Sequence, residues 1–162
     1  MSEQDGPALG PREVFGRMQR QWLSTTGADG HISGFQSLLA DDAVVELPFA
    51  PPGRPRRFRG RAEWLAFARG ARAGLPVRFE ECRETAVHET ADPGVIVVEY
   101  ELAGTVLTTG RRAAAPFIGV LRVRDGQVTG WREYQDTVAI ARALGQLPAL
   151  LASAGAEQDA GR

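Results

Sequence analysis

The sequence predicts an α+β domain in which a cone-shaped, curved, mostly antiparallel sheet is closed by helices around an internal pocket. Helical periodicity is concentrated before Pro76, and four alternating segments follow one another after it. Those segments are long and are joined by short turn signals, so the sheet should curl strongly. A curled sheet with helices on one side leaves a pocket of the kind that binds small molecules.

The first half of the chain supplies the helices. Apolar residues at near-helical spacing predict a helix over about 12 to 25, before the turn-rich TTGADG. Asp29 is a suitable N-cap for a second helix, which should end at the ADD that precedes a strand at 43 to 49. APPGRP is too rich in Pro and Gly to continue that strand, and residues 61 to 72 return to helix. The apolar side of this third helix consists of Trp64, Leu65 and Ala68.

The second half of the chain reads as consecutive hairpins. ADPG, TTGR and RDG mark the turns between four strands, at about 77 to 90, 95 to 108, 113 to 124 and 127 to 136. A last helix is expected over 137 to 144. We therefore expect one domain at 12 to 144, a disordered N-terminus at 1 to 11 and a C-terminal tail at 145 to 162.

Composition excludes several classes of function. The chain has 162 residues, with 19 Lys plus Arg against 20 Asp plus Glu, so its net charge of −1 gives no general attraction to nucleic acid or anionic membrane. All the basic residues are Arg, which excludes a Schiff-base or P-loop lysine. Cys82 is the only cysteine, and the polar N-terminus lacks an apolar signal segment. We expect a soluble, cytoplasmic protein that binds neither nucleic acid nor membrane.

Common catalytic and metal-binding motifs are absent. HExxH, GxSxG, GxGxxG and CxxC do not occur, and both histidines, His31 and His88, are isolated. Isolated histidines more often have structural roles than ligate metals, so we expect no metal site.

Five arginines surround Phe58 in GRPRRFRGR, residues 53 to 61. A basic patch with a stacking aromatic is one interpretation, and a solvated loop near the pocket mouth is the other. The near-neutral total charge favours the loop. If these arginines have a functional role, holding an anionic group of a small ligand suits them better than binding nucleic acid.

Strand alternation decides which side chains can meet inside the pocket. In the last strand one face carries Trp131, Glu133 and Gln135, and the other carries Arg132, Tyr134 and Asp136. In the strand at 95 to 108, Val95, Val97, Glu99 and Glu101 lie opposite Ile96, Val98, Tyr100 and Leu102. In the third strand the inward set should be Phe117, Gly119, Leu121 and Val123.

Glu133 is the leading candidate for chemistry. In an apolar interior, desolvation would raise its pKa and let it hold or accept a proton near neutral pH. The alternative is a surface carboxylate paired with Arg132, Arg122 or Arg83, because charged strand residues are mostly solvated.

Two segments, LLADDAVVELPFAPPGRPRRFRGRAEW and FIGVLRVRDGQVTGWREYQD, resemble a known family. They are similar to SnoaL-like proteins of the nuclear-transport-factor-2-like superfamily, which includes polyketide cyclases, ketosteroid isomerase and limonene epoxide hydrolase. The resemblance spans roughly residues 12 to 144 and implies the pocketed fold. It does not identify the reaction, because proteins of this fold have unrelated functions.

The resemblance argues against the ketosteroid isomerase mechanism and implies a catalytic role for the acidic position of Glu133. At the positions where ketosteroid isomerase has its base, its oxyanion tyrosine and its protonated aspartate, this chain has Leu47, Gln21 and Gly119, so that mechanism is not expected. A segment of limonene epoxide hydrolase resembles GWREYQD, and that enzyme has a catalytic aspartate at the position of Glu133. Polyketide cyclases similar to SnoaL also use an acid on this strand.

Other positions of the hydrolase site match only in part. Glu99 and Glu101 are the nearest counterparts of its Arg and Asp pair, and Val44 and Glu46 stand where it has Tyr and Asn.

The resemblance implies a cofactor-independent cyclase, isomerase or epoxide-opening enzyme acting on a polyketide-like apolar substrate. Glu133 would transfer the proton, with Glu101 as a second acid. The expected substrate-binding residues are Trp131, Phe117, Tyr100, Trp22, Phe49 and Glu46. The alternatives are a non-catalytic small-molecule carrier and an interaction module whose pocket is filled. A homodimer through the sheet is expected because Ile118 and Val120 would otherwise expose an apolar patch.

Overall fold

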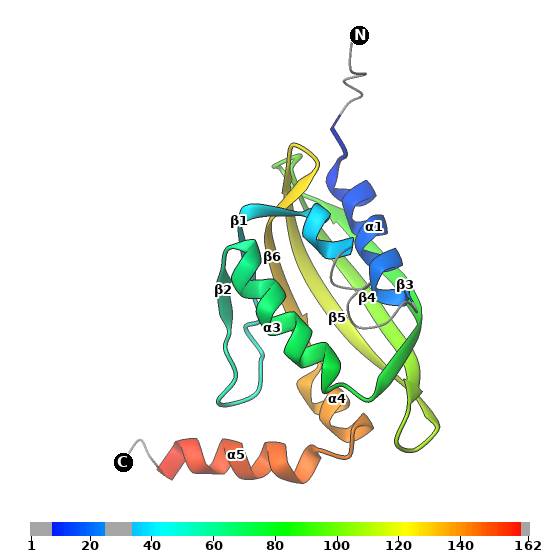
Figure 1. Cartoon of the computed structure of the whole chain (residues 1–162), viewed down its shortest axis with the longest axis vertical. Helices are drawn as coiled ribbons and strands as arrows, with labels where there is room; N and C mark the ends of the chain where they lie inside the picture. Colours follow the sequence, from blue (N-terminus) through cyan, green and yellow to red (C-terminus); the bar gives the residue numbers. More distant parts are fainter. Residues whose placement is uncertain (1–7, 25–33, 160–162) are drawn as a thin grey trace.

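The computed structural model describes residues 8–24 and 34–159, which form several helices and one six-stranded sheet (Figure 1). The helices are α1 (Pro11–Leu23), α3 (Arg61–Ala73), α4 (Thr137–Ala143) and α5 (Leu147–Asp159), and residues 34–38 are also helical. The strands are β1 (Leu39–Glu46), β2 (Arg57–Arg59), β3 (Val77–Glu89), β4 (Val95–Val106), β5 (Arg111–Arg124) and β6 (Gln127–Gln135).

The sheet has the order β2-β1-β6-β5-β4-β3 and is antiparallel except where β1 runs parallel to β6. Figure 1 shows the long strands β3 to β6 curving behind α1 and α3, which cover one face of the sheet. We call the opposite face the open face. The predicted α+β class with a curved, mostly antiparallel sheet is confirmed, and the sheet does not close into a barrel.

The core lies between the sheet and the helices α1 and α3. Val14, Phe15 and Met18 are the buried residues of α1, as the helical spacing predicted. The start of this helix is fixed by Glu13, whose side chain accepts a hydrogen bond from the Gly10 backbone N–H at 2.9 Å.

The connection from the second predicted helix to β1 differs from expectation. Residues 34–38 are helical, but β1 begins at Leu39, where the prediction placed its start at 43. Leu39 pairs with Val128 of β6, and the register shifts between Leu39 and Val44. The first part of β1 is therefore irregular, and its sequence lacks the alternation that marks a strand. The predicted N-cap Asp29 lies outside the described residues.

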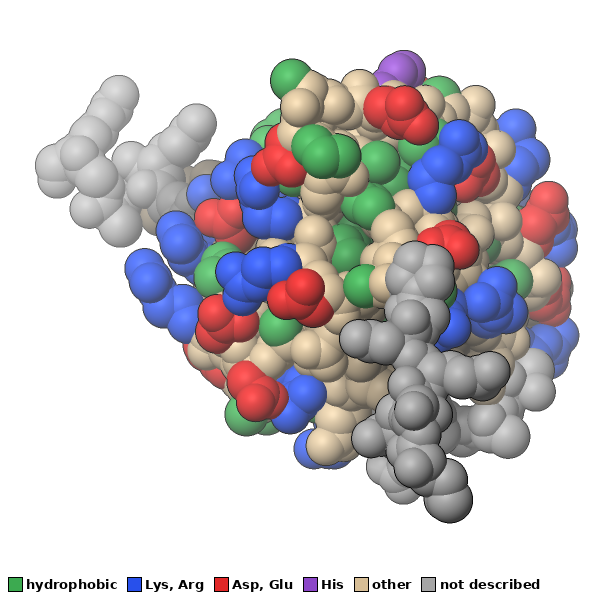
Figure 2. Space-filling view, turned by 90° about the horizontal axis from the view of Figure 1, so that it is seen from above, with side chains coloured by type: hydrophobic (Ala, Val, Ile, Leu, Met, Phe, Trp, Pro, Cys, Tyr) green, Lys and Arg blue, Asp and Glu red, His purple; other side chains and the backbone are tan. Residues whose placement is uncertain are grey.

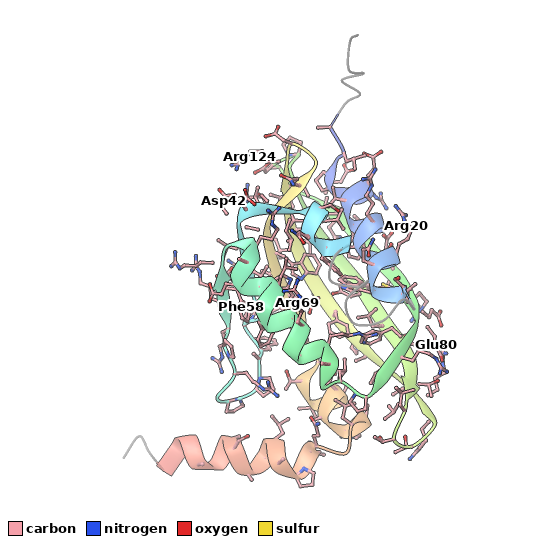
Figure 3. The ribbon with its side chains drawn as sticks, viewed as in Figure 1. Arg20, Asp42, Phe58, Arg69, Glu80 and Arg124 are labelled. Carbon is pink, nitrogen blue, oxygen red and sulfur yellow. The ribbon has the colours of Figure 1, made fainter. Side chains whose placement is uncertain are left out.

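The arginine-rich segment contains a short strand that the sequence analysis treated as a loop. Phe58 on β2 is only 2% exposed and packs against Trp64 and Phe67 of α3, with ring centroids 5.2 and 4.5 Å apart. Figure 3 shows it between β2 and α3. Its burial removes the interpretation of Phe58 as a stacking surface for bases.

The C-terminal tail also contains more structure than expected. Residues 147–159 form α5, which extends away from the sheet and contacts α4 (Figure 1). Leu and Ala are strong helix formers, and they dominate the first two turns of α5.

Candidate functional site

The candidate catalytic residue Glu133 lies on the face of β6 that points to the helix-covered side of the sheet. Trp131, Glu133 and Gln135 all line one cavity, while Arg132 lies on the open face and pairs with Glu46 at 2.8 Å. The face assignment that strand alternation predicted for β6 is therefore confirmed.

Both oxygens of the Glu133 carboxylate accept hydrogen bonds. The Tyr100 hydroxyl donates to Oε2, and Gln135 Nε2 donates to Oε1 at 2.9 Å. Tyr100 belongs to β4 and Glu133 to β6, so the two side chains meet across the intervening strand β5. The carboxylate is thus fixed in orientation.

Gly119 gives the Trp131 ring room on the inner face of β5. It is the β5 residue paired with Glu133, and a Cβ at this position would overlap the Trp131 ring. Without a side chain there, the indole lies over β5. A glycine inside a strand commonly marks such a close approach.

Aromatic stacking holds Tyr100 in place. The residue is 1% exposed, and its ring stacks on Trp22 at 5.2 Å and on Phe117 at 5.3 Å between centroids. These contacts leave the hydroxyl directed at Glu133.

Burial sets the protonation of this pair. Desolvation raises the pKa of Glu133, against the lowering effect of the hydrogen bonds from Tyr100, Gln135 and Trp131. The pKa of Tyr100 is raised well above its ordinary value by burial and by the adjacent Glu133 carboxylate. Tyr100 therefore stays a neutral donor, while Glu133 is the group that can gain or lose a proton.

The cavity has a volume of about 760 Å³, within the range typical of small-molecule sites. Its walls come mainly from α3, the inner face of the sheet, α4 with the residues just after it, and the loop before β2, and they are largely apolar. Among the described lining residues, Glu133 is the only carboxylate. The other polar or charged side chains of the lining are Gln135, Gln146, Arg54 and Arg72.

Four of the six residues predicted to bind substrate lie at or directly beside the cavity. Trp22, Phe117 and Trp131 line the cavity, and Tyr100 lies behind Glu133 with its hydroxyl bound to it. From the sequence, Tyr100 was predicted only as a substrate-binding residue, and Gln135 only as a neighbour of Glu133 on the same face of the strand. Both could have been found from the pattern, since Tyr100, Phe117 and Gln135 form one cross-strand row beside Glu133.

Three other candidates do not reach the cavity. Glu101 lies on the open face and binds Arg83 at 3.2 Å, so its placement as a second acid was wrong. Glu46 is also on the open face, where Arg132 and Arg57 bind it. Phe49 is 60% exposed and packs against Tyr134 beside a shallow surface depression.

The remaining candidates carry no site chemistry. Glu99 lies on the open face and binds His88 at 2.8 Å, and His31 lies outside the described residues. In the described part of the chain, no group of three His, Cys, Asp or Glu residues could hold a metal ion.

No described helix is both long and apolar enough to cross a membrane. Figure 2 shows acidic and basic side chains interspersed over the face seen from above.

Comparisons with known proteins agree with this fold. The model of the SnoaL-like domain matches residues 20–131. A PhzA/B-like protein of Pseudomonas aeruginosa is 35% identical over 121 residues, which cover 75% of this chain and 84% of that protein.

Solved structures match over most of their lengths. A Bacillus subtilis protein provisionally assigned as an isomerase has a TM-score of 0.73 at 23% identity, covering 84% of this chain and 93% of its own. IdmH of Streptomyces antibioticus, provisionally assigned as a polyketide cyclase, gives 0.64 at 22% identity, covering 83% and 98%. An LEH-like epoxide hydrolase of M. tuberculosis gives 0.58 at 22% identity, covering 86% and 92%. At such identities these structures support the fold alone.

Proposed function

Because the chain belongs to the SnoaL-like family, we propose that it is a cofactor-independent enzyme in which Glu133 transfers a proton to or from an apolar, polyketide-like small molecule. The observation that carries the proposal is a partly exposed carboxylate on the wall of an apolar cavity, with its pKa raised by burial. Such a group is suited to general acid or base catalysis near neutral pH.

The surroundings of Glu133 support a catalytic role over a purely structural one. A carboxylate kept only for stability would be expected to pair with a cation, and here the partners are the neutral donors Tyr100 and Gln135. They orient the carboxylate without forcing it to stay ionised at low pH.

A carboxylate of this kind can serve the related reactions of isomerisation, ring closure and epoxide opening. In the first two it removes a proton from carbon beside a carbonyl and returns it elsewhere. In the third it activates a water molecule or protonates the departing oxygen. Trp22, Phe117 and Trp131 provide flat apolar surfaces that orient the substrate.

The family includes more than one activity, so the first test concerns proton transfer itself. A simple probe is 2-tetralone, an apolar bicyclic ketone with acidic C–H bonds. Its hydrogen–deuterium exchange in D2O can be followed by NMR. We expect the wild-type protein to accelerate exchange and Glu133→Gln to abolish the acceleration while remaining folded.

The rival function is a non-catalytic pocket protein that carries a small molecule. That protein would bind 2-tetralone and leave its exchange rate at the buffer value. Binding with no acceleration by the wild type would therefore favour the carrier.

We also propose that the molecule forms a homodimer through the open face of the sheet. Ile118 is 44% exposed there, and its cross-strand neighbours are Tyr134 and Glu99. An apolar patch on a sheet face that no described helix covers is a common site of self-association.

A further inference from the structure

The cavity has a second charged feature at a distance from Glu133. Arg72 lines its wall near the end of α3, and Arg54 lines it from the exposed loop before β2. The proton-transfer chemistry of Glu133 has no use for either arginine.

Arg72 is held in place by neutral groups. Its Nη1 donates to the Val77 carbonyl oxygen at 3.2 Å, and its guanidinium carbon lies 4.9 Å from the centre of the Phe79 ring. These contacts orient the planar guanidinium and leave other N–H donors available, since the group has five.

No described carboxylate forms an ion pair with Arg72. By contrast, Arg78 of β3 and Arg112 of β5 both pair with Glu80. Arg72 is half-buried, and desolvation lowers the pKa of its guanidinium. A partly buried cation without a counter-charge is unfavourable, and an anionic ligand group would relieve that cost.

The strand register separates Arg72 from Glu133 along the cavity. Phe79, beneath the guanidinium, aligns through Gly104 with Ala113 of β5, whereas Glu133 aligns with Gly119. Six residues of strand correspond to about 20 Å of contour length, which the curvature of the sheet shortens. A ligand that reaches both groups is therefore elongated.

We propose that the substrate is an elongated amphiphile whose carboxylate binds Arg72 while its apolar body extends along the aromatic wall toward Glu133. Arg54 stands at the exposed rim of the same cavity and adds a weaker, solvent-screened attraction. This inference rests on the proposed function, because it places the reacting carbon at the Glu133 end.

A matched pair of fluorescent probes tests the assignment without any turnover. Anthracene-2-carboxylate and anthracene-2-carboxamide share one rigid apolar body and nearly one shape, and differ in charge. A charge-assisted hydrogen bond is worth enough to predict at least about a tenfold tighter binding of the carboxylate by the wild-type protein. Fluorescence titration measures both affinities.

Substitutions then test whether Arg72 causes the preference for the carboxylate probe. Arg72→Gln should reduce the affinity for the carboxylate about tenfold and change that for the carboxamide less than about twofold. Arg72→Lys keeps the charge and should retain part of the preference. Arg20→Gln is the control for net charge, since Arg20 is exposed on the outside of α1 (Figure 3) and should leave both affinities unchanged.

The proposal is overturned if the wild type does not prefer the carboxylate, if the preference survives in Arg72→Gln, if both probes weaken equally, or if neither binds. Its failure is distinguishable from that of the proposed function. Carboxamide binding with no carboxylate preference removes the Arg72 assignment and leaves proton transfer by Glu133 standing. Unchanged 2-tetralone exchange in Glu133→Gln removes the catalytic assignment and leaves the Arg72 result intact.

Discussion

At the scale of single residues, the hydrogen bond from Tyr100 moderates the acidity of Glu133. Burial alone raises the pKa of this carboxyl, and the phenol donor opposes the rise by stabilising the ionised form. The rise caused by burial outweighs the hydrogen bonds, so the pKa of Glu133 stays above its ordinary value.

Replacing Tyr100 with Phe removes that donor and keeps the stacked ring. The pKa of Glu133 should then rise further, because the ionised form loses a hydrogen bond worth about 1.5–3 kcal/mol. Base-catalysed 2-tetralone exchange requires ionised Glu133, so its increase with pH should begin at higher pH in Tyr100→Phe. A pH–rate profile that is unchanged or moves to lower pH would show that the bond does not control the acid.

Residue-level prediction succeeded where a motif or apolar character accompanied alternation, as on β6 and β5, and failed on β4, where both faces carried candidates. Trp131, Glu133 and Gln135 were placed on one face correctly, and the resemblance identified that face as the inner one. For β4 the same rule separated Glu101 from Tyr100, but it does not say which set faces inward. Arg72 had no signal, because its role depends on neighbours that only the tertiary structure provides.

At the scale of elements, local pattern identified the main helices and strands between Pro11 and Ala143 and missed β2, the irregular start of β1 and the C-terminal helix α5. The four strands after Pro76 and the helices at 11–23 and 61–73 lie close to their predicted positions. β2 has three residues and exists because Phe58 packs under α3, a contact between segments. The start of β1 was missed because a register shift breaks its alternation.

α5 is peripheral to the site, and we propose that residues 12 to 144 carry the activity. Among the described elements α5 packs on α4, and Leu151 is largely exposed. A chain ending at Gln146 keeps every described cavity-lining residue. It should accelerate 2-tetralone exchange within about twofold of the full chain, since surface changes away from buried contacts have small effects.

The truncated chain can be compared with the full chain by thermal melting and by exchange rate under the same conditions. A loss of most of the activity with an unchanged melt would mean that α5 contributes to the site.

At the scale of the whole molecule, the two faces of the sheet have different roles. The helix-covered face encloses the cavity, and the open face presents ion pairs around Ile118 and Val120. The fold was predictable at this scale, because the order of helical and alternating segments and the family resemblance agree.

Dimerisation through the open face predicts a selective effect of charge. Ile118→Arg should convert a dimer into a monomer, because it places a cation in an apolar contact. Val138→Arg is the matched control, since Val138 has similar exposure on α4 and lies off the sheet. Light scattering coupled to size exclusion gives the mass. A wild-type monomer, or a dimer that tolerates Ile118→Arg, would rule out this interface.

The central claim is that Glu133 is the proton-transferring group, and one comparison of exchange rates tests it most directly. Glu133→Gln and Glu101→Gln make the same isosteric change on opposite faces of the sheet. With 2-tetralone in D2O at neutral pH, we expect Glu133→Gln to reduce the protein-accelerated exchange by about 100-fold or more, the usual contribution of a general base. Glu101→Gln should stay within about twofold of the wild type. Equal rates in the wild type and Glu133→Gln, or a large loss in Glu101→Gln alone, would contradict the account.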